Sequence, residues 1–84
     1  MYRVIPDSAV LDQIDALPAE LLPLLAEAFG MLELAPHAGR PYNDDLPDGP
    51  MRELILGSGG QIAVPYLIVD HVREVHVLVV QWFC

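Results

Sequence analysis

Arg52 and His76 are the two side chains whose types and positions could do chemistry on a substrate. Arg52 stands in "MREL", where its guanidinium could hold a phosphate oxygen or pair with a carboxylate of a partner protein. His76 alternates with apolar residues near the C-terminus, and its imidazole could act as a general base with Arg52 or Glu53 if their strands are neighbours. The structural alternatives are a half-buried His76 and an Arg52 paired with acids of the preceding loop, namely Asp44, Asp45 and Asp48.

Three further residues are candidate contacts to RNA or to a partner protein. Arg40 and Tyr42 lie together in "HAGRPYNDDLPDGP", a predicted loop dense in Pro, Gly, Asn and Asp. An arginine beside a tyrosine could stack on a base, and the structural alternative is a half-buried tyrosine that anchors the loop. Arg73 lies in "DHVR", the short turn that precedes the last predicted strand, and is the third candidate.

The charge of the chain restricts its partners. Its 84 residues include twelve acids, four arginines and no lysine, which gives a formal net charge of −8. Such a surface repels phosphate, so binding to mRNA or to the ribosome without assistance is disfavoured. One cysteine and no paired Cys or His spacing predict neither a disulfide framework nor a metal site, and no cofactor is expected.

The hydrophobic pattern predicts which elements position these residues. A β run at Tyr2–Ile5 precedes a helix in "PDSAVLDQIDAL", which Asp7 or Ser8 would cap. A second helix follows in "LPAELLPLLAEAFGMLELAP", where Pro23 predicts a kink or a later start. The remaining predicted strands are Met51–Leu56, Gln61–Val69 and Glu74–Phe83. The order β-α-α-β-β-β predicts one α+β domain over residues 1–84, an antiparallel sheet packed on one face by a helical hairpin.

The last predicted strand is apolar on both faces. Read as continuous, it places Val75, Val77 and Val79 on one face and His76 with several apolar residues on the other. The helical hairpin covers only one face of a sheet, so we expect a partner chain or a second copy to cover the other. The residues predicted to form that covered face are Leu67, Val69, Leu78, Val80 and Trp82.

No segment of the sequence reads as a targeting or membrane segment. The longest apolar stretch, residues 62–69, is far shorter than the roughly 20 residues that a membrane span needs. No apolar run follows the early arginine at the N-terminus, so no signal peptide is predicted. Together with the single cysteine, this predicts a cytoplasmic protein without a membrane partner.

The order of elements and several short segments resemble the RelE/ParE superfamily of bacterial type II toxin–antitoxin toxins. The resembling segments are "YRVIPDSAV", the helical pair from "LPAE" to "MLELAP", then "MREL", "QIAVPYLIVD" and "VREVHVLVVQWF". The resemblance implies a cytoplasmic toxin that an antitoxin wraps. It also implies an activity: members of the RelE-like branch cut mRNA in the ribosomal A site, and members of the ParE-like branch inhibit DNA gyrase.

The sequence departs from the RelE pattern at the positions that carry its chemistry. Arg52 matches an arginine that the family places on this strand. Gln61, Ile62 and Ala63 stand where a catalytic arginine is expected, and the chain ends in "QWFC" without the usual terminal acid or base. Two functions therefore stay open: an mRNA-cleaving toxin that uses Arg52 and His76, and a non-catalytic module or gyrase inhibitor that acts by binding protein.

Overall fold

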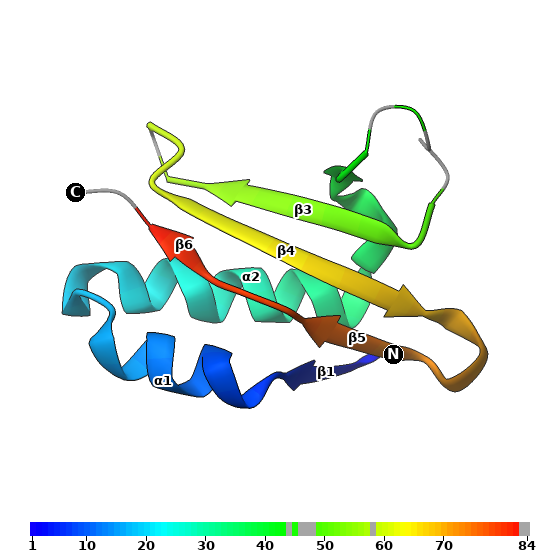
Figure 1. The fold of residues 1–84 in the computed structure, drawn as a ribbon, viewed down its shortest axis with the longest axis horizontal. Helices are drawn as coiled ribbons and strands as arrows, with labels where there is room; N and C mark the ends of the chain where they lie inside the picture. The colour runs from blue at the N-terminus through cyan, green and yellow to red at the C-terminus, as the bar shows by residue number, and fades with distance from the viewer. Residues whose placement is uncertain (44, 46–48, 58, 83–84) are drawn as a thin grey trace.

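The computed structural model describes residues 1–43, 45, 49–57 and 59–82. The chain forms a six-stranded sheet with two α-helices along one side of it (Figure 1). The elements are β1 Arg3–Pro6, α1 Ser8–Ala16, α2 Leu22–Leu34, β2 Arg40–Pro41, β3 Met51–Leu56, β4 Ile62–Val69, β5 Glu74–Val77 and β6 Gln81–Trp82. Short 3-10 turns lie at Ala19–Leu21, Pro36–Ala38 and Asp70–Val72.

Both helices begin where local chemistry favours a start. Asp7 caps α1, and its side chain accepts a hydrogen bond of 2.8 Å from the backbone N–H of Ser8. Pro23 lies in the first turn of α2, where a proline removes no intrahelical hydrogen bond. The later start predicted from Pro23 is therefore confirmed. None of the helices in the described ranges is long and apolar enough to cross a membrane.

The strand order is β1-β5-β4-β3-β2, with β6 paired to β4. The predicted α+β class is confirmed, and the predicted helices and strands follow one another in the predicted order. The structure adds a two-residue strand, β2, at Arg40–Pro41, inside the segment predicted as a loop. The sheet is mixed rather than wholly antiparallel, because β1 pairs with β5 in parallel, Arg3 opposite Glu74. The helices carry the chain across the sheet between β1 and the later strands, and such a crossover permits parallel pairing.

The predicted last strand is interrupted at residues 78–80 (Figure 1). Tyr66 opposes Val77 in the β4–β5 ladder, whereas Ile62 opposes Trp82 in the β4–β6 ladder. Four steps along β4 thus correspond to five along its partner, and this extra residue is a β-bulge. The backbone N–H of Val80, within the bulge, donates to the side-chain oxygen of Gln13 on α1 at 2.8 Å.

Because of the bulge, each side chain after it lies on the opposite face of the sheet from the one it would occupy in an uninterrupted strand. Val75 and Val77 are fully buried on the helical side, and Val80 joins them with 1% exposure. Trp82 opposes the buried Ile62 and packs against the same core. The prediction that Val80 and Trp82 share the outer face with His76 is therefore wrong, because it assumed an uninterrupted strand.

The core lies between the helices and one face of the sheet. The helices contribute Val10, Leu17, Leu21, Leu25, Ala28 and Leu32. The strands and the bulge contribute Leu54, Ile62, Val64, Tyr66, Ile68, Val75, Val77 and Val80. The opposite face of the sheet has no such cover within the described residues, and we call it the open face.

Arg73, in the turn between β4 and β5, has a left-handed backbone with φ 53°. Only glycine adopts that conformation without steric cost, so we expect Arg73→Gly to raise the free energy of unfolding by up to about 1 kcal/mol. Arg73→Ala keeps the Cβ and should leave that free energy within a few tenths. Urea unfolding of the native chain and the two variants measures the change in the free energy of unfolding. Equal changes in both variants would mean that the lost charge, and not the backbone conformation, causes the effect.

Candidate functional site

Strand pairing brings several predicted site residues onto the open face. Residues opposed across a ladder share a face, so His76 lies with Leu67 and Ile5, and Leu67 lies with Met51. The backbone N–H of Tyr42 donates to the Met51 carbonyl at 3.1 Å. This bond extends the β2–β3 register and places Tyr42 at the edge of the same row.

The centre of the open face is apolar and partly exposed. Leu78 continues the register of β5, because its N–H donates to the Pro65 carbonyl at 3.2 Å. The apolar side chains of this face that remain partly or well exposed are Ile5, Met51, Ile55, Leu67, Val69 and Leu78. Three members of the predicted covered face, Leu67, Val69 and Leu78, thus lie together here. Val80 and Trp82 do not, because the bulge turns them toward the helices.

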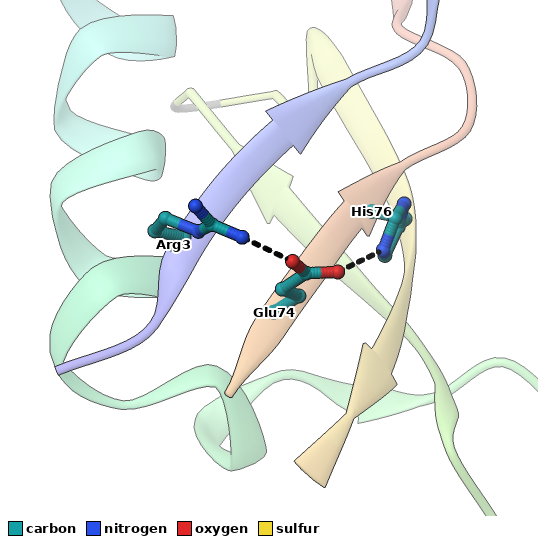
Figure 2. A network of polar contacts seen from close by, with 3 residues as sticks. All are labelled: Arg3, Glu74 and His76. Carbon is teal, nitrogen blue, oxygen red and sulfur yellow. Dashed lines mark hydrogen bonds and ion pairs between the residues drawn. The ribbon is translucent and has the colours of Figure 1, made fainter. Parts of the chain in front are cut away.

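A polar network borders the open face on the β1–β5 side. Figure 2 shows the carboxylate of Glu74 between the guanidinium of Arg3 and the ring of His76. Arg3 forms an ion pair with Glu74, and Glu74 Oε1 lies 3.0 Å from His76 Nε2. Hydrogen bonds from Arg3 and then from His76 lower the pKa of the Glu74 carboxyl below its usual value. His76 is half-buried, as its structural alternative predicted.

The lowered pKa of Glu74 predicts an acid-dependent loss of stability. A carboxylate with a lowered folded-state pKa stabilises the fold fully above the unfolded-state pKa, and this contribution disappears as pH falls through the folded-state value. Glu74→Gln should therefore unfold at lower urea concentration than the native chain at pH 7, with the gap closing below about pH 4. Asp12→Asn, on the exposed side of α1, controls for the loss of one charge. A gap that is the same at pH 7 and pH 3 would contradict the network.

A second ion pair borders the opposite side of the open face. Arg40 Nη2 lies 2.7 Å from Glu53 Oε1, and its Nε donates to the same oxygen at 3.1 Å. The Arg40 side chain is 65% exposed, whereas that of Glu53 is 13% exposed. Arg3 and Glu74 repeat the arrangement: the Arg3 side chain is 77% exposed and that of Glu74 is 19% exposed. Each border of the open face therefore presents an arginine outward above a largely buried carboxylate.

Arg52 lies on the helical side of the sheet, away from His76. It opposes the buried Tyr66, and its Nη1 donates to the Gly39 carbonyl at 3.0 Å. Strand β4 separates the strands of Arg52 and His76, and the two side chains leave the sheet on opposite faces. The predicted joint action of Arg52 and His76 on one phosphate is therefore not supported by this geometry. Asp44 and Asp48, two of the loop acids expected beside Arg52, lie outside the described residues.

The other predicted contacts lie at the rim. Tyr42 is 55% exposed rather than anchored in the loop, and Arg73 is exposed in the β4–β5 turn. Sequence reasoning missed Arg3 and Glu74, because no local pattern indicates that the first strand pairs with the fifth. The described part of the chain brings no three His, Cys, Asp or Glu side chains together as a metal site, and it forms no pocket.

Solved structures share this fold over nearly the whole chain. A chain of the RelBE2 toxin–antitoxin complex from Mycobacterium tuberculosis superposes with a TM-score of 0.79, at 25% identity and 98% coverage of both chains. A chain of the intact E. coli RelBE toxin–antitoxin complex superposes with a TM-score of 0.78 at 17% identity, and the match covers 100% of this chain and 99% of that chain. The isolated E. coli RelE toxin also superposes with a TM-score of 0.78, at 15% identity, and the match covers 98% of this chain and 84% of that chain. No protein-family model and no curated protein matches the sequence. The chain therefore has the RelE fold.

Proposed function

We propose that this chain is the toxin-like component of a cytoplasmic toxin–antitoxin pair and that it acts through its open face. The observation that carries the proposal is the likeness, over nearly all of this sequence, to chains of two RelBE toxin–antitoxin complexes. The open face supports it, because a partly exposed apolar row between two outward arginines is the composition of a protein-binding surface. A cognate antitoxin is the partner that would silence it.

Protein binding is the mode of action that the geometry favours. Metal-free RNA cleavage needs a base, an acid and a cation around one phosphate. Arg52, the candidate cation, lies on the helical side, and His76 is engaged by Glu74. Binding to a protein target such as a gyrase needs none of these groups. Cleavage of ribosome-bound mRNA is the second candidate, supported by His76 and the outward Arg3 and Arg40 on the same face.

Induced expression in a bacterial host tests the proposal. We expect growth arrest that co-expression of the antitoxin from the adjacent gene relieves. Ile55→Asp, on the open face at 43% exposure, should abolish the arrest, whereas Leu11→Asp, 53% exposed on α1, should retain it. Normal growth with abundant soluble native protein would overturn the proposal. If both substitutions abolished the growth arrest equally, the open face would not be the surface through which the chain acts.

Primer extension on mRNA from arrested cells separates the two modes of action. Arrest without new cleavage ends supports protein binding. Cleavage ends that vanish in His76→Gln but persist in Arg52→Ala would support cleavage through the open face alone. Both variants must be shown to be folded by circular dichroism, because Arg52 also bonds the Gly39 carbonyl.

A further inference from the structure

A second exposed apolar surface lies on α2, on the side of the helix that faces away from the core. Its seven exposed positions are Leu22, Pro23, Ala26, Glu27, Gly30, Met31 and Leu34, and we call them the α2 stripe. Leu22 and Met31 are each 41% exposed, and Leu34 is 75% exposed. A surface helix usually carries polar residues on this side. Here Glu27 is the one charged residue among the seven.

The rest of the molecule makes this low charge unusual. The chain has twelve acids, and the exposed side of the neighbouring α1 carries Asp12 and Asp15. Two copies with a net charge of −8 repel each other, so self-association is least opposed where carboxylates are fewest. The α2 stripe is such a surface, and it lies across the molecule from the open face.

We propose that the α2 stripe packs against the α2 stripe of a second copy in an antiparallel, two-fold symmetric pair. Leu22, Ala26, Gly30 and Leu34 form one row at four-residue spacing. The order large, small, small, large reads the same in both directions, so in an antiparallel pair each Leu22 meets the other copy's Leu34 while the small residues face each other. This is the self-complementarity that a two-fold interface requires.

The backbone of α2 is accessible at the middle of this row. A Cβ added at Gly30 would meet nothing within 4 Å in the isolated chain. Gly30 therefore leaves room for a second helix to approach closely, as small residues do in other helix pairs. The exposed side of α2 would favour such a pair whether or not the chain is a toxin.

The length of α2 sets the strength of the association. Its 13 residues span about 20 Å, and a helix pair of that length buries less than the roughly 1,200 Å² typical of stable complexes. The dimer should therefore exchange with monomer, with a dissociation constant on the order of 100 µM. Salt should tighten it by screening the repulsion between the two acidic copies.

Sedimentation equilibrium of the purified chain from 10 µM to 1 mM tests the proposal. We expect the mass to rise from the 9.3 kDa monomer toward twice that value, and to rise earlier at higher salt. Leu34→Glu should raise the dissociation constant at least tenfold, while Leu11→Glu on α1 and Ile55→Asp on the open face should leave it within about twofold. A 9.3 kDa species throughout, or greater loss from either control, overturns the proposal.

A charge-pair variant tests the antiparallel arrangement. Leu22→Lys and Leu34→Glu alone should each weaken the dimer. Together in one chain they should restore at least part of the loss, because each introduced ammonium then meets an introduced carboxylate of the other copy. A parallel pair would place like charges together and give no recovery, which would overturn the arrangement proposed here.

Discussion

Replacing Gly39 with alanine is expected to lower the free energy of unfolding by about 3 kcal/mol, a large share of the 5–15 kcal/mol typical of a domain. The added Cβ would lie 2.0 Å from the hydroxyl oxygen of Tyr66 and 3.1 Å from the Glu53 carbonyl oxygen. Tyr66 is fully buried and its hydroxyl donates to the Pro36 carbonyl at 2.6 Å, so it cannot move without losing that bond. Urea unfolding measures the loss.

Gly30→Ala is the matched control for this substitution. Gly30 lies in the exposed part of α2 with open space around its Cα, so alanine should raise stability there by about 0.5–1 kcal/mol through helix propensity alone. The comparison is made at low micromolar concentration, well below the dissociation constant expected for the proposed α2 pair. Adding Tyr66→Phe to Gly39→Ala removes the clashing oxygen and should recover part of the loss. A Gly39→Ala chain as stable as the native one would contradict the packing around Tyr66.

The burial of Tyr66 also affects the pKa of its hydroxyl. Burial raises the pKa of the Tyr66 hydroxyl above its usual value, although the hydrogen-bonding and charged groups near it act in the opposite direction. A neutral hydroxyl donates one hydrogen bond and keeps the strand β4 tied to the turn at Pro36–Ala38. Tyr66, Gly39 and Arg52 therefore belong to the support of the sheet on its helical side.

Local patterns predicted the elements of this fold well. Strand β3 runs from Met51 to Leu56 as predicted, because turn-forming residues bound it on both sides. The α2 helix starts where Pro23 permits it to start. Each of these features depends on residues that are close in the sequence, which is why the sequence alone suffices for them.

Contacts between distant segments were not predictable in this way. The Arg3–Glu74 ion pair joins residues 71 positions apart and depends on the parallel pairing of β1 with β5. The sequence also did not determine on which face of the sheet Arg52 lies, because "MREL" places an apolar residue on each face of the strand. The candidate site was therefore predicted as a set of residues but not as a geometry, and Arg52 and His76 separated once the faces were known.

The β-bulge could not be predicted from the sequence for a different reason. Residues 75, 77 and 79 and residues 78, 80 and 82 are all apolar, so the sequence fits an uninterrupted strand and a bulged strand equally well. An alternating pattern would have marked the point where the faces exchange. The structure resolves it through Val80, which is buried with Val75 and Val77 rather than lying outside with Leu78.

Val80→Asp is expected to leave the domain largely unfolded, whereas Val79→Asp is expected to fold. The Val80 side chain is 1% exposed in the core, and a carboxylate there would be buried without a partner, which costs several kcal/mol. Val79 keeps partial contact with solvent, so a carboxylate at that position should lower the free energy of unfolding by about 1 kcal/mol. Circular dichroism and urea unfolding of both variants measure the contrast.

The sign of this contrast decides between the two strand registers. In an uninterrupted strand Val79 would share the buried face with Val75 and Val77, and Val79→Asp would be the damaging change. Gln13→Ala provides an independent check, because it removes the side-chain oxygen that accepts from the Val80 N–H of the bulge and should lower stability by about 1–2 kcal/mol. A tolerated Val80→Asp together with a neutral Gln13→Ala would exclude the bulge and return Val80 to the open face.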